Sequence, residues 1–142
     1  MTPRAILETA IYATDLDAAA GFYGGVLGLE TAARAGSRHV FFRLDAAMLL
    51  VFNPAATALP PSPGGLPVPP HGAHGPGHVA FAASGAELDR WRARLEEAGV
   101  AIEADFRWPG GDGAPGARSI YVRDPAGNSV ELAEPRLWGF PA

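Results

Sequence analysis

The sequence predicts an α+β fold in which two βαβββ modules pair to form one domain, an open curved sheet shaped as a cup. The order strand–helix–three strands occurs twice along the 142 residues. The residues also repeat, because positions 8–13 overlay 78–83 and positions 39–52 overlay 119–132. Such an internal repeat usually means two similar units that pack together to complete one core.

The first module is expected over about residues 4–53. The apolar run 5–13 indicates a strand, and Thr14 and Asp15 suit a helix cap before apolar residues at helical spacing up to Val26. Each of three glycines inside this helix weakens it by about 1 kcal/mol relative to alanine. Two strands over 39–44 and 48–52 then follow a weaker one over 30–34, which gives the βαβββ order.

Residues 54–76 have a different composition, with eight prolines and four glycines in 23 positions. Proline and glycine at this density predict a long loop rather than a helix or strand. We expect this loop to tether the two modules, and it can also act as a lid.

The second module is expected over about residues 77–134. A strand over 77–83 precedes a capping box at Ser84 and Glu87 and an apolar helix face that ends before Gly99. A strand over 100–107, a second glycine- and proline-rich loop over 108–116, and a hairpin of strands 117–123 and 129–133 complete it. The tail, 135–142, carries exposed-looking aromatic residues that pack on a sheet, on a partner or over the cup.

Composition excludes several classes of function. The net charge is −4 and the calculated pI is about 5.5, so the chain lacks the basic patch of a nucleic-acid-binding protein. The absence of cysteine excludes disulfides, thiolate metal sites and cysteine nucleophiles. Neither a signal peptide nor a transmembrane run is recognisable, so we expect a cytoplasmic protein without a membrane partner. Open sheet edges need covering, which predicts a homodimer.

Alternation along strands places metal-competent side chains on the inner face of each predicted sheet. Glu8 shares a face with Tyr12, and His78 and Glu131 point inward from the second module. The ungapped overlay pairs Glu8 with His78, and Val51 with Glu131. The alternatives are an exposed acid for Glu8, a histidine hydrogen-bonded between sheets for His78, and an ion pair with Arg43 or Arg123 for Glu131.

Three stretches resemble the vicinal oxygen chelate superfamily, which includes glyoxalase I, bleomycin-resistance proteins and extradiol dioxygenases. They are ILETAIYATDLDAAAGFYGGVLGLE, GPGHVAF and YVRDPAGNSVEL, and the match spans roughly residues 5–134. The resemblance implies a metal at the mouth of the paired modules, with ligand positions Glu8, Val51, His78 and Glu131. Since Val51 cannot ligate, it implies a metal site of Glu8, His78 and Glu131, for Mn, Fe, Ni, Mg or Zn.

The resemblance also implies the chemistry. A divalent metal would polarise a small-molecule substrate through two neighbouring oxygens, in a lyase- or isomerase-like reaction. Glu8 or Glu131 would move a proton, and Tyr121 would donate to an oxyanion from across the hairpin. The side chains expected to bind substrate are Tyr12, Phe41, Arg43, Val51, Arg123 and Trp108.

Two other functions remain open at the level of sequence. A metal-free protein that sequesters a drug or metabolite fits the aromatic content and the missing fourth ligand. An extradiol dioxygenase fits the run from Tyr121 to Glu131, but positions 112–114 are Asp, Gly and Ala where that chemistry needs a histidine. We expect His71 and His74 to be loop or lid residues, with His71 pointing into the pocket, and His39 to line the pocket or the surface.

Overall fold

The computed structural model describes residues 1–111 and 113–141. The chain forms two compact units, Met1–Gly77 and His78–Ala142. Each unit contains one four-stranded mixed sheet and at least one helix, and neither sheet closes on itself, so the predicted α+β class with two βαβββ modules is confirmed. Position 112, the first of those compared with the dioxygenase histidine, lies outside the described residues. Within the described residues, no helix has the length and apolarity that crossing a bilayer requires.

The sheet of the first unit has the strand order β1-β4-β3-β2. Its strands are β1 Glu8–Tyr12, β2 Glu30–Ala35, β3 His39–Arg43 and β4 Met48–Phe52. The parallel pairing of β1 with β4 requires a crossover, which α1 (Leu16–Ala20) and η1 (Gly21–Val26) begin. These helices cover one face of the sheet, and the buried core there is formed by Ile11, Leu16, Ala19, Phe22, Tyr23, Val40, Phe42, Leu49 and Val51.

The predicted first helix changes its winding at Gly21. Asp15 caps α1 as expected, because its side chain accepts a hydrogen bond from the Ala18 N–H. From Gly21 the chain continues as a π-helix, a wider form that appears mostly as short insertions in α-helices. Phe22 and Tyr23 are consecutive, yet both are buried, with ring centroids 5.0 Å apart. The helical periodicity of the sequence alone does not predict this change of winding.

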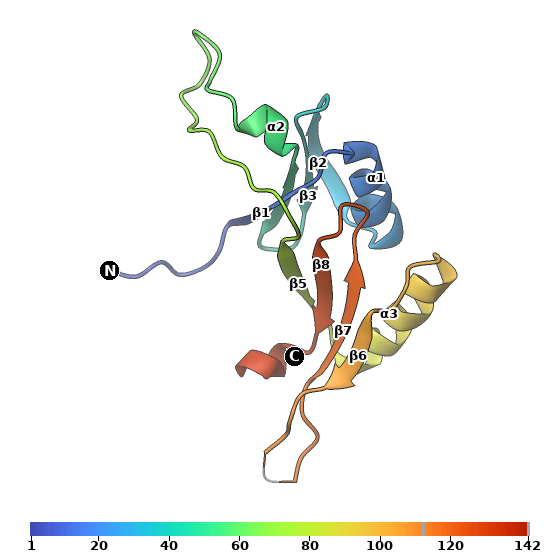
Figure 1. Ribbon diagram of the computed structural model, residues 1–142. Helices are drawn as coiled ribbons and strands as arrows, with labels where there is room; N and C mark the ends of the chain where they lie inside the picture. Colours follow the sequence, from blue (N-terminus) through green and yellow to red (C-terminus); the bar gives the residue numbers. More distant parts are fainter. Residues whose placement is uncertain (112, 142) are drawn as a thin grey trace. The chain divides into compact units, whose positions relative to one another are not determined.

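The loop after β4 is not wholly irregular. Its first residues form the short helix α2 (Pro54–Thr57), which Asn53 caps through its side-chain oxygen. The prediction of a loop over 54–76 is therefore wrong for these four residues, since a cap followed by proline at the first turn is a helix start. Beyond α2 the chain makes an extended excursion without further helix or strand until β5 (Figure 1).

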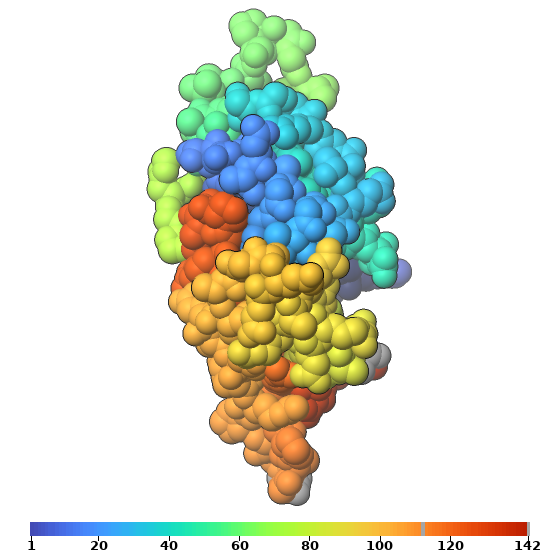
Figure 2. Space-filling model, turned by 90° about the vertical axis from the view of Figure 1, so that its right-hand side faces the viewer, coloured from blue at the N-terminus to red at the C-terminus, as the bar shows by residue number. Residues whose placement is uncertain are grey.

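The second unit repeats the topology, with strand order β5-β8-β7-β6. Its strands are β5 His78–Ala82, β6 Ala104–Arg107, β7 Arg118–Arg123 and β8 Ser129–Ala133. Helix α3 (Gly85–Glu97) begins with the predicted capping box of Ser84 and Glu87. Leu88 and Leu95 of this helix are fully buried, and α3 packs against β7. Figure 2 shows α3 (yellow) at the surface of this unit, next to the orange segment that follows it. A short 3-10 helix, η2 (Pro135–Trp138), ends the unit.

The expected strand over 100–107 is shorter in the structure. Only Ala104–Arg107 form β6, because this edge strand has β7 as its single partner and their register runs from Ala104–Tyr121 to Arg107–Arg118. The first strand likewise covers only Glu8–Tyr12, since β4 offers five residues for pairing.

The registers correct the predicted partner of Glu131. Glu131 lies opposite Ala80 and Tyr121, whereas Val51 lies opposite Ile11 and Val40 on the helix-covered face, fully buried. The residue of the first unit that corresponds to Glu131 is Leu50, which lies opposite Ala10 and Phe41. The assignment of Val51 to the inner face and to substrate binding is therefore wrong.

The cause of this correction is the length of one turn. Residues 44–47 join β3 to β4, but residues 124–128 join β7 to β8, so the second turn is longer by one residue. Side chains alternate along a strand, and a shift of one residue moves each of them to the opposite face. The ungapped overlay of the two modules aligns β3 with β7 correctly, but it misaligns β4 with β8 by one residue.

Two arginine–aspartate contacts fasten α3 to the sheet of the second unit, and a third joins β7 to β6 within that sheet. The guanidinium of Arg118 donates to Asp105 through two nitrogens, at 2.7 and 2.8 Å, and it also reaches Asp89 of α3 at 2.6 Å. Arg92 of α3 donates to the same Asp105 carboxylate at 2.5 Å. The hydrogen bond from Arg118 is the main cause that lowers the pKa of Asp105 to about 2, against the opposing effect of burial.

This network predicts an acid-sensitive contribution to stability. Because the folded state lowers the Asp105 pKa from 3.8 to about 2, its contribution is complete above pH 3.8 and is lost as the pH falls toward 2. Urea unfolding of the wild type and of Asp105→Asn between pH 5 and pH 2 measures it. We expect their difference in unfolding free energy to shrink across that interval, and a constant difference would contradict the role given to this carboxylate.

Candidate active site

The face of the second sheet opposite α3 presents a polar set on β5, β7 and β8. Tyr121 lies directly opposite Glu131 across the hairpin, as predicted. His78 begins β5, and its Nε2 lies 3.3 Å from the Glu131 Oε2. The His78 side chain is 51% exposed and that of Glu131 only 7%. The structure thus brings three of the predicted site residues together within the second unit.

Glu131 carries the one buried side-chain oxygen of the described residues that has no hydrogen-bond partner, Oε1. An unpaired oxygen of a buried carboxylate is costly, because the group has given up its hydration without a replacement donor. The alternative ion pair with Arg123 is wrong, since the Arg123 guanidinium donates instead to Glu103 at 2.5 and 2.9 Å. The Glu131 Oε1 is therefore available to bind a group that is not part of the protein chain.

Tyr121 is held between aromatic neighbours and the carboxylate. Its ring stacks on Phe106, with centroids 5.9 Å apart, and on His78 at 6.2 Å. Burial raises the pKa of Tyr121 to about 12, and the neighbouring Glu131 carboxylate acts in the same direction. The hydroxyl of Ser119 opposes this shift of the pKa. Tyr121 is therefore a phenol and a hydrogen-bond donor at neutral pH.

The corresponding face of the first sheet is aromatic. Phe52 lies at the centre, with ring centroids 5.1 Å from Phe41, 5.9 Å from His39 and 4.6 Å from His71. His39 and Phe41 stack at 4.0 Å. Burial and the neighbouring Arg38 lower the pKa of His39, which keeps this imidazole neutral at pH 7.

His71 fastens the long loop to this aromatic set. Its Nδ1 lies 2.8 Å from the Tyr12 hydroxyl oxygen, and its backbone N–H donates to the Thr57 carbonyl at 3.0 Å. The loop histidine that was expected to point into a pocket is thus half-buried against Tyr12 and Phe52. His74 is exposed.

The other predicted residues lie at the margins of the two faces. Glu8 is exposed at the start of β1, on the face of Tyr12, and Arg43 lies 3.9 Å from Glu30. Trp108 is 36% exposed, and its indole N–H donates to the Ser119 hydroxyl at 2.9 Å. Within each unit, the described residues contain no group of three His, Asp or Glu side chains able to hold a metal.

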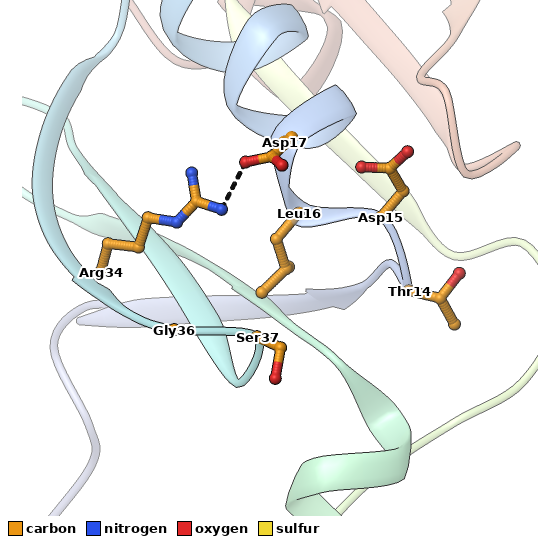
Figure 3. A pocket seen from close by; sticks show the side chains of 7 residues that line it. All are labelled: Thr14, Asp15, Leu16, Asp17, Arg34, Gly36 and Ser37. Atoms are coloured by element: carbon orange, nitrogen blue, oxygen red, sulfur yellow. Dashed lines mark hydrogen bonds and ion pairs between the residues drawn. The ribbon is translucent and has the colours of Figure 1, made fainter.

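A surface hollow of about 510 Å³ in the first unit contains none of the predicted site residues. Figure 3 shows it lined by α1, its cap and the β2–β3 turn, with an ion pair between Asp17 and Arg34. The Asp17 side chain is 86% exposed, so solvent screens this pair and it offers no acceptor comparable to Glu131.

Sequence reasoning missed Ser119, Phe52 and the contact between Tyr12 and His71. Alternation along β7 and β4 places Ser119 beside Tyr121 and Phe52 beside Leu50, so the signal was present for these two. The Tyr12–His71 hydrogen bond joins residues 59 positions apart across an irregular loop, and no periodicity reports it.

The donors on the second sheet fit a divalent metal. Glu131 offers a buried oxygen without a partner, and His78 offers an imidazole nitrogen on the same face. A carboxylate oxygen with an imidazole nitrogen suits Mn, Fe, Ni, Zn or Mg. Tyr121, which lies directly opposite Glu131 across the hairpin, would help to orient the carboxylate, as outer partners of metal ligands commonly do.

Comparisons with known proteins agree with this fold. The family described as "Glyoxalase/Bleomycin resistance protein/Dioxygenase superfamily" matches residues 5–132. A lactoylglutathione lyase from Agrobacterium tumefaciens is 45% identical, with a TM-score of 0.90, and the match covers 99% of this chain and 100% of that one. A glyoxalase/bleomycin resistance protein/dioxygenase from Nocardioides is 22% identical, with a TM-score of 0.69 over 94% of this chain and 85% of that one, which shows the fold alone.

No curated protein matches the chain by sequence. The family match nevertheless spans nearly the whole chain, both sheets have the expected βαβββ topology, and the lyase structure is similar over its full length. The chain belongs to the Glyoxalase/Bleomycin resistance protein/Dioxygenase superfamily.

Proposed function

We propose that the protein is a divalent-metal-dependent lyase or isomerase that acts on a small substrate with vicinal oxygens. The observation that carries the proposal is the buried Glu131 Oε1, which lacks a hydrogen-bond partner among the described residues and lies on the face of His78. A buried carboxylate oxygen without a hydrogen-bond donor lowers the stability of the folded protein, and binding a metal would offset that cost. The 45% identity to a lactoylglutathione lyase supports the same class of reaction.

Three residues are proposed to hold the metal, which would supply Lewis-acid polarisation of the substrate oxygens when bound. His78 and Glu131 come from the second unit. Glu8 is proposed as the third ligand because it occupies the register position of the first unit that corresponds to His78. The proposal includes pairing of the two modules in a cup, within one chain or between the chains of a homodimer.

Proton movement is assigned to carboxylates and the phenol. Glu8 or Glu131 moves the proton between neighbouring carbons of the substrate, because a carboxylate is a base of suitable strength for an acidified C–H. Tyr121 donates a hydrogen bond to the oxygen on which charge develops, and its raised pKa keeps the proton available for that bond.

The open faces of the two sheets are proposed to have different roles. On the open face of the second sheet, Tyr121 and Glu131 lie opposite each other on neighbouring strands. The equivalent pair in the first sheet is Phe41 and Leu50. We assign Phe41 and Tyr12 to binding the organic part of the substrate, with Arg43, Arg123 and Trp108 at the margins. Both rings are half-buried and present aromatic surface, which suits that role.

The reaction to test first is the one that joins lactoylglutathione with its two components. A lyase that splits this thioester without water returns the thiol of glutathione and the three-carbon 2-oxoaldehyde, whose two oxygens are vicinal. We expect chelator-free protein to contain a divalent metal and to form lactoylglutathione from these two compounds, as followed by thioester absorbance. Elemental analysis identifies the metal, and reconstitution with Mn, Fe, Ni, Mg or Zn ranks the ions.

Variants test the ligand set. Glu8→Gln and His78→Ala should each lose metal, whereas Glu30→Gln, another exposed glutamate of the first sheet, should keep it. Retention of metal by Glu8→Gln would remove Glu8 from the site. Absence of metal, with tight binding of a small molecule after chelator treatment, would contradict the proposal and favour a sequestering protein.

A further inference from the structure

A second hollow of the first unit, of about 520 Å³, is formed by α2, the proline-rich loop that follows it and Arg38. Pockets for small molecules have volumes of roughly 300–1,000 Å³, so this hollow is large enough for one. Its lining includes Thr57, Leu59, Leu66, Val68 and three prolines of the loop. None of the residues assigned above to the metal or to the substrate lines it, so it is a separate candidate site.

The loop that forms this hollow is closed at its base. The His71 backbone N–H donates to the Thr57 carbonyl at 3.0 Å, and Thr57 is buried. Residues 58–70, between these bonded ends, have the length of an Ω-loop, a compact surface loop that is frequently functional. The returning end is also fixed to β1, since the His71 Nδ1 lies 2.8 Å from the Tyr12 hydroxyl oxygen. Both ends of the loop are therefore anchored within the first unit.

The tip of the loop is held in a defined turn. The Gly65 N–H donates to the Ser62 carbonyl at 2.9 Å, and Gly64 between them has a φ of 76°. Proline at the second position, here Pro63, and glycine with positive φ at the third are the features of a type II turn. Because proline fixes φ, a loop rich in proline loses less conformational freedom when a ligand binds than an ordinary loop does.

Three apolar side chains of the loop lie exposed around the hollow. The exposed fractions are 66% for Leu59, 81% for Leu66 and 53% for Val68. The Val68 N–H donates to the Leu66 carbonyl at 2.8 Å, which fixes the spacing of these two residues. Exposed apolar side chains that gather at one place mark binding surfaces. An apolar group that entered the hollow would remove them from water.

Arg38 is the one charged residue of the lining. Its guanidinium donates to the His39 Nδ1 at 3.1 Å and lies 5.8 Å from the centre of the Phe52 ring, while its backbone carbonyl accepts from the Asn53 N–H at 2.9 Å. No carboxylate of the described residues pairs with Arg38. A guanidinium has five N–H donors, so those not used by His39 remain for a carboxylate, which arginine binds through two parallel hydrogen bonds.

We propose that this hollow is a binding site for a small amphipathic monocarboxylate, an anion with an apolar chain or ring. Arg38 binds the carboxylate, and Leu59, Leu66 and Val68 contact the apolar body. The positive charge selects an anion over an alcohol or an amine of the same shape. This inference goes beyond the proposed function, because it depends on neither the metal nor the substrate.

Octanoate is the probe, and the full chain is titrated while its amide signals are followed by NMR. Octan-1-ol and octylammonium carry the same chain without the negative charge. We expect saturable shifts at Thr57, Leu59 and Leu66, none at His78 or Glu131, and octanoate binding at least about 10-fold tighter than the other two compounds. Absence of saturable shifts, or equal binding of the three compounds, would overturn the proposal.

Substitutions in the lining separate the two parts of the ligand. Arg38→Gln should weaken octanoate binding at least about 10-fold and leave octan-1-ol unchanged. Leu66→Ser should weaken both compounds by about 5-fold, because it removes apolar contact alone. Arg4→Gln is the matched control, since Arg4 is another exposed arginine of the first unit without a carboxylate partner among the described residues. Octanoate binding that does not change in Arg38→Gln would contradict the assignment.

Two further measurements distinguish this site from the other surfaces of the protein. A carboxylate can also bind a metal, so the titration is repeated after chelator treatment. We expect the same affinity, and its loss would place octanoate on the metal and overturn the proposal. A wild type without metal contradicts the proposed function and leaves this inference standing. Sedimentation of the wild type and of Leu66→Ser tests a second copy of the chain as the occupant: dissociation of an oligomer by this substitution, with no binding of octanoate, would show that the hollow is an interface.

Discussion

Glu131→Leu is expected to abolish metal binding and to stabilise the metal-free protein. The variant installs in the second sheet the residue that the first sheet has at the equivalent position, Leu50. Loss of a carboxylate ligand should weaken metal binding by about 100-fold or more, beyond the effect of losing an outer partner. In the metal-free state, the variant relieves a buried oxygen without a partner, so its unfolding free energy should rise by about 1–2 kcal/mol.

A loss of metal affinity together with a gain in unfolding free energy distinguishes a metal-binding carboxylate from one that stabilises the fold. Metal affinity is measured by competition with a chelating dye, and unfolding free energy by urea denaturation of chelator-treated protein. Glu103→Gln is the control, because this carboxylate lies in the same unit but pairs with Arg123 on the surface. A Glu131→Leu protein that is destabilised by several kcal/mol without metal would show that Glu131 has a structural role instead.

The elements predicted best from sequence are those with strong local signals. β4 and β8 match their predicted bounds, since each begins directly after a turn that joins it to the strand before it. The capping box places the start of α3 correctly, because Ser84 and Glu87 satisfy each other locally. The hairpin pairing of Tyr121 with Glu131 follows from the turn composition.

The errors of prediction from sequence arise where the local structure depends on a tertiary contact or on a single additional residue. Val51 went to the wrong face because one extra residue in the β7–β8 turn does not show in an ungapped overlay. The π-helical segment depends on how Phe22 and Tyr23 pack together, which a helical period does not contain. The hydrogen bond from the Trp108 indole to the Ser119 hydroxyl joins a loop residue to β7, and no periodicity predicts it.

Asp124→Ala is expected to cost the second unit about 3 kcal/mol of unfolding free energy. The buried Asp124 carboxylate accepts three hydrogen bonds within the turn, from the Ala126 N–H at 2.9 Å, the Asn128 N–H at 2.8 Å and the Asn128 side-chain amide at 2.8 Å. Removing it leaves buried donors on Asn128 without this acceptor, and each such donor costs about 1–3 kcal/mol. Asp124→Asn keeps one acceptor oxygen and should cost less.

The same substitution should reach the site, because this turn sets the register of β7 and β8. A slip of one residue would turn Glu131 toward α3 and bring Val130 or Leu132 to the open face. Urea denaturation gives the stability, and metal affinity of the folded fraction reports the register. Asp45→Ala, in the shorter and exposed turn between β3 and β4, is the matched control and should change stability by less than about 0.5 kcal/mol. Equal effects of the two substitutions would show that the longer turn does not determine which face Glu131 occupies.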